Sequence, residues 1–141
     1  MQSVIVDTSC LYAMVDRDDD FHQRCVDVLI RDDLAFVVSP YVVAELDYLV
    51  ATRMGLDTEV KTLLQLSSGR FTLAPMTASD MRVAVSIITN YPKLQIGLAD
   101  ASLVVLAKHH HTKSILTLDR RHFDVVRPLQ GGRFTLLPAR R

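Results

Sequence analysis

The sequence predicts an α/β fold with a central, mostly parallel sheet that is flanked by helices on both faces. Short apolar runs that are typical of buried strands alternate along the chain with longer segments of helical periodicity. The length of 141 residues, of which 49% are hydrophobic, fits one domain over residues 1–141 with a single core. No internal repeat or low-complexity segment suggests another organisation.

Each predicted strand is a short run of apolar and β-branched residues bounded by polar or turn-forming residues. The first run ends abruptly at Asp7, and the fourth ends at Asp119. The last run precedes a short tail, residues 139–141, and is expected at an edge of the sheet. The predicted strands are residues 3–6, 35–38, 71–73, 114–118 and 134–137.

The predicted helices have boundaries that capping and breaking residues set. Ser and Thr cap first turns, proline fits there without losing a hydrogen bond, and glycine or proline stops a helix. The boundary residues are Thr8 and Ser9, Ser39 and Pro40, Gly55, Thr77 with Asp80 in a capping box, Pro92 and Gly97. The predicted helices are residues 8–15, 21–30, 40–52, 57–66, 77–89 and 98–110.

The composition limits the classes of protein to which this chain can belong. Sixteen basic and sixteen acidic residues balance, so the net field does not attract nucleic acid, although a local groove can still be basic. Two cysteines are too few for a disulfide framework and are expected to be buried thiols. The sequence shows no secretory signal and no apolar stretch that is long enough to span a bilayer. A cytoplasmic protein is therefore expected.

Four acids occupy positions where an acid is costly. Asp7 and Asp119 each end an apolar strand, where a parallel sheet presents its ligands. Glu45 lies within an apolar helix and shares a face with core residues, so its carboxylate must be paired or neutralised. Asp100 lies in the first turn of another apolar helix.

Each acid also has a purely structural interpretation. Asp100 favours its helix dipole, an effect of about 0.3–1 kcal/mol. Asp7 and Asp119 each precede a helical turn that an aspartate can cap. If all four carboxylates lie at one end of the sheet, however, each raises the pKa of the others unless a cation binds between them. Mg²⁺ and Mn²⁺ prefer oxygen ligands and would neutralise the carboxylates. A site of this kind is typical of enzymes that cleave phosphate esters.

Four motifs, in order and spacing, resemble those of the PIN-domain ribonucleases, and within them the VapC toxins of bacterial toxin–antitoxin pairs. The resemblance spans nearly the whole chain. Each motif alone is weak evidence, whereas four in register are specific. The motifs are Val4-Ile5-Val6-Asp7-Thr8-Ser9, Ser39-Pro40-Tyr41-Val42-Val43-Ala44-Glu45-Leu46, Gly97-Leu98-Ala99-Asp100-Ala101-Ser102-Leu103, and Leu116-Thr117-Leu118-Asp119-Arg120-Arg121-His122-Phe123.

The resemblance implies a three-layer PIN-like sandwich and an endoribonuclease that cleaves single-stranded or loop RNA, whether tRNA, rRNA or mRNA. It assigns Asp7, Glu45, Asp100 and Asp119 to one or two Mg²⁺ or Mn²⁺ ions, with Asp7 and Asp100 as the core ligands. A metal-activated water is expected to attack the phosphate. The resemblance also implies a homodimer and a cognate VapB-type antitoxin that covers the site.

Neighbouring side chains have supporting roles in this hypothesis. Thr8, Ser9 or Thr117 is expected to position water or a carboxylate behind the ligands. Arg120 and Arg121 follow Asp119 and either reach flanking phosphates or are ordinary solvated arginines. His122 is interpreted as a packing or surface residue, with contact to the substrate as the alternative.

An apolar surface is expected where Leu46, Leu49 and Val50 meet the following helix. It is interpreted as a dimer or antitoxin contact, with an ordinary intramolecular core as the alternative.

Two other classes of protein fit parts of the pattern. A phosphoacceptor signalling domain also places acids at strand ends, but it needs an acidic pair after the first strand and a lysine after the last. Here Thr8 and Ser9 follow Asp7, and Lys113 precedes its strand. A non-catalytic PIN-like binding module would have lost an acid, and none of the four is missing.

Overall fold

A single five-stranded sheet runs through the middle of the computed structural model, which describes residues 1–139. The strand order is β3-β2-β1-β4-β5, and every neighbouring pair is parallel. This arrangement confirms the predicted fold class. Of the predicted tail 139–141, residues 140 and 141 lie outside the described residues. The strands are β1 (Gln2–Val6), β2 (Leu34–Val38), β3 (Phe71–Leu73), β4 (Ser114–Leu116) and β5 (Thr135–Leu137).

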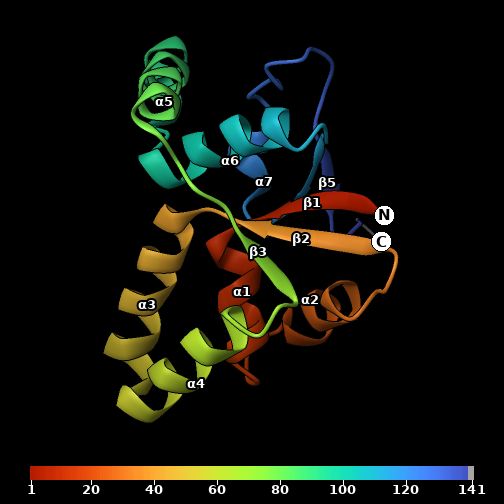
Figure 1. Ribbon diagram of the computed structural model, residues 1–141, viewed down its shortest axis with the longest axis vertical. Helices are drawn as coiled ribbons and strands as arrows, with labels where there is room; N and C mark the ends of the chain where they lie inside the picture. The colour runs from red at the N-terminus through yellow and green to blue at the C-terminus, as the bar shows by residue number, and fades with distance from the viewer. Residues whose placement is uncertain (140–141) are drawn as a thin grey trace.

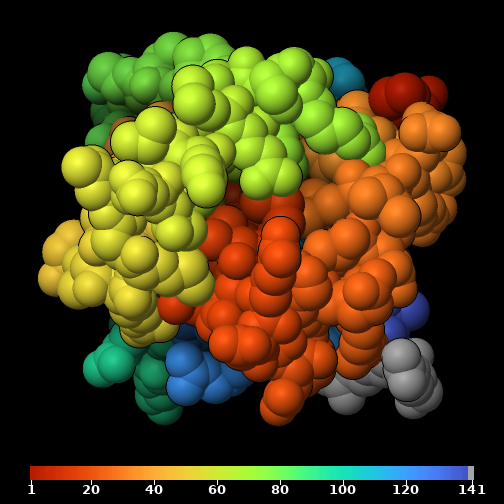
Figure 2. All heavy atoms as spheres, turned by 90° about the horizontal axis from the view of Figure 1, so that it is seen from below, coloured from red at the N-terminus to blue at the C-terminus, as the bar shows by residue number. Residues whose placement is uncertain are grey.

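Helices cover both faces of the sheet. Figure 1 shows α5, α6 and α7 on one side of it and α1 to α4 on the other. On the second face, α1 lies between α2 and the α3–α4 pair (Figure 2). The helices are α1 (Thr8–Val15), α2 (His22–Leu29), α3 (Pro40–Met54), α4 (Leu56–Leu66), α5 (Ala78–Asn90), α6 (Leu98–His109) and α7 (Arg120–Phe123), with a 3₁₀ turn η1 (Pro92–Leu94).

The centre of the core is formed by β1 and α6. Val4, Ile5 and Val6 are fully buried, and every residue of α6 from 101 to 107 is buried. In the register of the sheet, Ile5 lies beside Val37 of β2 and Ile115 of β4. Because all strands are parallel, their carboxyl ends share one edge, and β1 and β4 are adjacent there.

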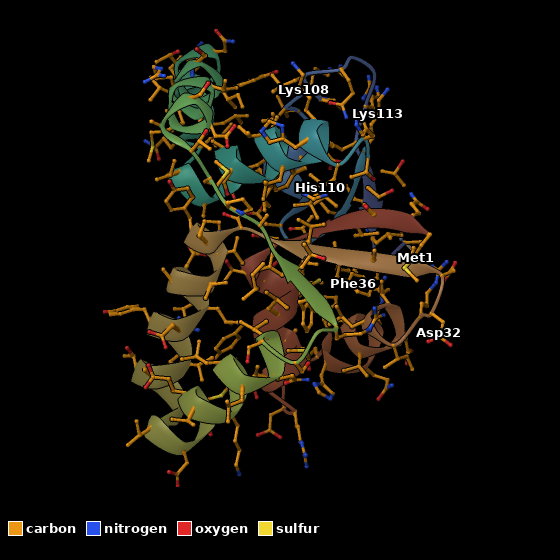
Figure 3. The ribbon with its side chains drawn as sticks, in the orientation of Figure 1. Met1, Asp32, Phe36, Lys108, His110 and Lys113 are labelled. Carbon is orange, nitrogen blue, oxygen red and sulfur yellow. The ribbon has the colours of Figure 1, made fainter. Side chains whose placement is uncertain are left out.

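The opposite edge carries the amino-terminal ends of the strands. Figure 3 shows Met1 and Asp32 at this edge, while Phe36 lies inside the sheet. Lys113 directly precedes β4, so it belongs to the same amino-terminal edge. Acids that follow β1 and β4 are therefore separated from Lys113 by the length of a strand.

Several predicted boundaries are confirmed by capping geometry. The hydroxyl of Ser39 accepts a hydrogen bond from the backbone N–H of Tyr41, with Pro40 in the first turn of α3. Thr77 and Asp80 form the predicted capping box of α5. At α1 the prediction that Thr8 or Ser9 caps the helix was wrong, whereas the alternative that Asp7 caps it is confirmed, and Thr8 is the first helical residue.

The fourth strand is shorter than predicted, ending at Leu116 instead of residue 118. The reason is local, since the hydroxyl of Thr117 donates to the carboxylate of Asp7 and also accepts from the N–H of Asp119. These side-chain bonds turn the chain out of the sheet just before Asp119.

The expected apolar surface divides between core and exterior. Leu46 and Val50 are fully buried, so the intramolecular interpretation holds for them. Exposed apolar side chains lie instead on α4, at Leu56, Val60, Leu63 and Leu64. Within residues 1–139, no helix combines the length and the apolar character that crossing a membrane requires.

Candidate active site

A cleft of about 540 Å³ opens at the carboxyl edge of the sheet, where α1, α3 and α6 meet the loop after β4. Four acids from four separate segments line this one cleft, and all four are the acids singled out in the sequence. They are Asp7, Glu45, Asp100 and Asp119. The parallel topology explains the convergence, because it brings the ends of β1 and β4 beside the amino end of α6.

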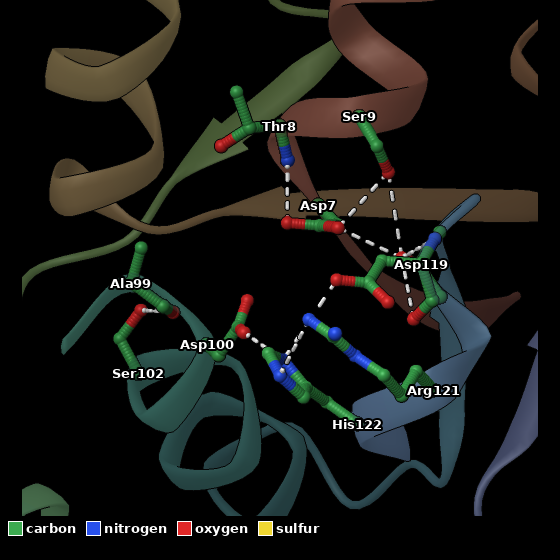
Figure 4. Close-up of polar contacts among 10 residues, drawn as sticks. Asp7, Thr8, Ser9, Ala99, Asp100, Ser102, Asp119, Arg121 and His122 are labelled. Atoms are coloured by element: carbon green, nitrogen blue, oxygen red, sulfur yellow. Dashed lines mark hydrogen bonds and ion pairs between the residues drawn. The ribbon is translucent and has the colours of Figure 1, made fainter. Parts of the chain in front are cut away.

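Asp7 is the most enclosed of these acids, with 5% of its surface exposed. The backbone N–H of Thr8 donates to Oδ1 at 2.7 Å. The hydroxyls of Ser9 and Thr117 donate to Oδ2 at 2.9 and 2.7 Å (Figure 4). Asp7 therefore has three neutral donors and no cationic partner among the described residues.

Burial is the main reason that the pKa of Asp7 is raised from 3.8 to about 6. The nearby carboxylate of Asp100 raises it further, while the hydrogen bonds from Thr117, Ser9 and Thr8 oppose the shift. Desolvation of the charged form thus outweighs three hydrogen bonds that favour it. A cation in the cleft would remove this cost.

Ser9 and Thr117 also join the two ends of the site. The backbone N–H of Leu118 donates to the hydroxyl of Ser9 at 2.9 Å, and that of Asp119 donates to the hydroxyl of Thr117 at 3.0 Å. The same hydroxyls that hold Asp7 therefore hold the loop that carries Asp119. Thr117 is fully buried, so this link is not exposed to competing solvent.

Asp100 has a different environment, because a histidine lies against it. Oδ2 of Asp100 is 2.6 Å from Nδ1 of His122, and the same nitrogen is 3.8 Å from Oδ2 of Asp119. Arg121 reaches Nε2 of His122 at 3.4 Å (Figure 4). With Nε2 accepting from Arg121, the proton of the imidazole lies on Nδ1 and is donated to Asp100.

The pKa of Asp100 is also raised, chiefly by desolvation and further by the carboxylates of Asp119 and Glu45, against the opposing hydrogen bond from His122. His122 is only 7% exposed, so of the two roles expected for it burial agrees with packing and contradicts a surface position. His122 follows Asp119, the N-cap of α7, by three residues, and this places it near the acids, but nothing in the sequence indicated its contact with Asp100.

Glu45 reaches the cleft from α3, but not in the way that its apolar neighbours suggested. Its side chain is exposed at the cleft, whereas Val42 and Leu46 on the same helix are buried. The prediction that Glu45 shares the face of the core residues, and so must be paired or neutralised, was therefore wrong. A buried hydrogen bond from Ser102 of α6 to Ser39 at the start of α3, 2.7 Å long, fixes the helix of Glu45 against that of Asp100.

The remaining predicted residues are divided between the site and its surroundings. Thr8 lines the cleft, and its buried hydroxyl has no hydrogen-bond partner among the described residues. Arg121 lies beside Asp119 and His122 (Figure 4). The guanidinium of Arg120 donates to the carbonyl of Pro138, which directs it to the C-terminal segment. Asp119 is the N-cap residue of α7, but its carboxylate makes no capping bond, so the capping role considered for its side chain is not observed.

The donor set fits a divalent cation. Within residues 1–139, ligand atoms of Asp100, Asp119 and His122 all lie within 4.8 Å of one another, and Asp7 and Glu45 line the same cleft outside this tight group. Hard cations such as Mg²⁺ prefer oxygen ligands, which the carboxylates supply. The imidazole then serves as the partner that orients Asp100, as is common around bound metals.

The raised pKa of Asp7 predicts a pH-dependent stability for the metal-free protein. A folded-state pKa of about 6 above the ordinary 3.8 means that the stability from the protonated form is full below pH 3.8 and is lost as the pH rises through 6. Asp7→Asn cannot ionise, so between pH 4 and 8 wild type should lose about 2 kcal/mol relative to this variant. Urea unfolding in EDTA at both pH values measures the difference.

Asp32→Asn, at an exposed acid far from the cleft, is the matched control and should follow wild type. Parallel pH profiles for wild type and Asp7→Asn would show that Asp7 is an ordinary carboxylate.

The hydroxyl of Thr117 should matter for cation binding more than for the fold. Thr117→Val keeps the shape but removes the donor to Asp7 and the acceptor for the Asp119 N–H, so Mn²⁺ affinity should fall roughly 10- to 100-fold. Calorimetric Mn²⁺ titration measures this. The control is Thr112→Val, which removes a buried threonine bonded to Ser3 and Ser114, away from the cleft. Equal Mn²⁺ affinities for both variants would contradict a positioning role for Thr117.

Known structures share this architecture. VapC20 from Mycobacterium tuberculosis, described as a sarcin-ricin loop cleaving toxin, superposes with a TM-score of 0.74 at 18% identity, over 79% of this chain and 86% of that one. The VapBC2 complex from Rickettsia felis, bound to a promoter DNA fragment, gives a TM-score of 0.69 at 15% identity, over 96% and 97% of the two chains. At these identities the likeness concerns the fold.

Similarity in sequence identifies the family of this chain. The chain is 49% identical to Ribonuclease VapC26 from Mycobacterium tuberculosis (strain ATCC 25618 / H37Rv) over 135 residues, which cover 96% of this chain and all of that protein. The sequence profile of the PIN domain matches residues 4–128, a span that includes all four acids of the cleft. The family profile over most of the chain and the 49% identical relative show that this chain belongs to the PIN-domain family.

Proposed function

We propose that this protein is an endoribonuclease toxin of the VapC type, which hydrolyses RNA with a Mg²⁺ or Mn²⁺ ion held by Asp7, Glu45, Asp100 and Asp119. The observation that carries the proposal is the convergence of these four acids, from four segments, in one cleft. The likeness to a ribonuclease at 49% identity over nearly the whole chain supports the same activity.

We assign residues at the cleft roles as metal ligands, positioning residues or a phosphate-binding residue. Asp7 and Asp100 would be the principal ligands, and Glu45 and Asp119, which line the same cleft, would complete the donor set. A divalent cation bound there lowers the pKa of water and stabilises the negative charge that develops on the phosphate. Ser9 and Thr117 keep Asp7 in one orientation, and His122 does the same for Asp100. Arg121, beside Asp119, is placed to bind a phosphate oxygen of the RNA.

Single-stranded or loop RNA is the proposed substrate. The acids line an open cleft, and unpaired nucleotides can present their backbone and bases to such a surface. In a regular RNA duplex the bases are paired and stacked, and the major groove is too deep and narrow for side chains to read.

The two rival functions have less support. A phosphoacceptor domain needs a lysine near its acids, and Lys113 lies at the amino-terminal edge of the sheet (Figure 3). A binding module without catalysis does not need four acids in one cleft, two of them with raised pKa values.

We also propose a homodimer and a VapB-type antitoxin that covers the site. Related structures are toxin–antitoxin complexes, for example those from Rickettsia felis and Klebsiella pneumoniae. The exposed apolar side chains of α4, such as Leu56 and Leu64, support a protein contact on that face.

RNA cleavage should depend on the two principal ligands. Asp7→Asn and Asp100→Asn should each lower the cleavage rate, because each removes a negative charge from the cation site. The loss should exceed the 10- to 100-fold that is typical when a residue hydrogen-bonded to a metal ligand is replaced. Sequencing of RNA ends after induced expression of wild type and of each variant identifies cuts that only wild type makes. EDTA should abolish cleavage by the purified protein, and Mg²⁺ or Mn²⁺ should restore it.

Circular dichroism of each variant checks that the fold is kept, and Asp32→Asn serves as a charge-matched control. Full cleavage by Asp7→Asn in buffer with Mg²⁺ would refute the assignment of the site.

The oligomeric state is tested by light scattering during size-exclusion chromatography. The protein alone should have twice the mass of one chain, because the apolar face of α4 is otherwise exposed to water. A mass of one chain at micromolar concentration would contradict the dimer.

A further inference from the structure

The cleft presents an electrostatic problem for its proposed substrate. Besides the four candidate ligands, Asp19 also lines it, so five acids face an RNA backbone that carries one negative charge per nucleotide. One or two divalent cations offset only part of this charge. RNA therefore needs a positive group of the protein near the cleft, and among the described residues Arg53 is the one arginine or lysine in its lining.

Arg53 is held in place without having its charge neutralised. It is the next-to-last residue of α3 and is exposed, with its guanidinium 5.2 Å from the ring centre of Tyr12 on α1. Tyr12 lines the same cleft. Within residues 1–139, Arg53 makes no ion pair and no side-chain hydrogen bond. A stacked guanidinium keeps its N–H donors at its edge, free for a phosphate.

The position of Arg53 along α3 indicates which phosphate it meets. Arg53 follows Glu45 by eight residues on the same helix, which corresponds to roughly 12 Å along the axis. By that axial offset, Arg53 lies to one side of Glu45 in the cleft. This position suits a neighbouring phosphate on the α3 side, while Arg121 lies on the α7 side of the acids.

Several other cations of the described chain are engaged or lie away from the cleft. Arg24 also stacks on an aromatic ring, that of Phe21 at 5.7 Å, but it donates to the carbonyl of Ala139 and lies outside the cleft lining. Arg31 pairs with Asp33. Lys108 and Lys113 lie toward the other end of the molecule (Figure 3).

From this geometry we infer that Arg53, positioned by the ring of Tyr12, binds a backbone phosphate of single-stranded RNA next to the cleaved bond. The inference deepens the proposed ribonuclease function and rests on it. Arg53 is the binding residue, and Tyr12 is a positioning residue that acts through it. A purely structural role for Arg53, at the negative end of the α3 dipole, would affect stability alone.

The kinetic test uses Arg53→Gln, with Arg24→Gln as the matched control for a stacked arginine outside the cleft. On an RNA that carries a cut site mapped for wild type, Arg53→Gln should raise KM about tenfold and leave kcat within about twofold, since the contact is made before and during the reaction. Arg53→Lys keeps the charge without the planar fork and should recover part of the loss. Arg24→Gln should match wild type.

The binding test does not depend on cleavage. Fluorescence anisotropy with a short, fluorescein-labelled single-stranded RNA of mixed sequence measures the dissociation constant from about 50 to 200 mM KCl. Loss of one phosphate contact should reduce the slope of log affinity against log salt by about 0.7. Tyr12→Phe should leave both values unchanged, whereas Tyr12→Leu should resemble Arg53→Gln, and the double variant should be no weaker than either alone.

Unchanged KM and unchanged salt slope in Arg53→Gln, with wild type cutting RNA normally, would overturn this inference and leave the proposed function intact. Wild type that neither cuts nor binds RNA would overturn both. A variant whose RNA binding is normal, but whose affinity for an antitoxin falls, would also overturn it by assigning Arg53 to a protein partner. Because Arg53 is exposed, its replacement is not expected to prevent folding.

Discussion

The burial of one carboxylate at the end of the central strand is the constraint on which the site depends. Asp7 is placed there by β1, the central strand of the sheet, whose last three residues are fully buried, and it also begins α1 as its N-cap. Three neutral donors orient it, yet they do not compensate for desolvation, so its pKa remains raised. A folded chain that keeps an acid in this state has a ready site for a cation, which would convert an unfavourable charge into a ligand.

The other acids show how the fold supports the same centre by different means. Asp100 is oriented by the imidazole of His122, whereas Asp119 is carried by a loop that Ser9 and Thr117 anchor. Such outer partners commonly fix the geometry of metal ligands. The groups that orient Asp7 and Asp100 are hydroxyls, a backbone N–H and an imidazole, and no lysine or arginine forms an ion pair with either acid among the described residues. The negative charge of the cleft therefore stays available for a cation.

The sequence predicted the features that depend on local pattern and on topology. Strand and helix positions followed from periodicity and capping, and the convergence of the four acids followed from a parallel sheet whose strand ends share one edge. Contacts between distant side chains were not predictable in this way. The pairing of Asp100 with His122 joins two segments through exact side-chain placement. The exposure of Glu45 depends on the width of the cleft, which periodicity along one helix does not determine.

The central claim is that the acidic cleft binds a hard divalent cation. A crystal soaked with Mn²⁺ and measured at an energy where manganese scatters anomalously tests this most directly. A strong anomalous peak between the carboxylates of Asp7, Asp100 and Asp119, absent from crystals of Asp7→Asn, is the result expected. Ordered carboxylates around a cleft without any peak, or manganese bound only elsewhere on the protein, would contradict the account.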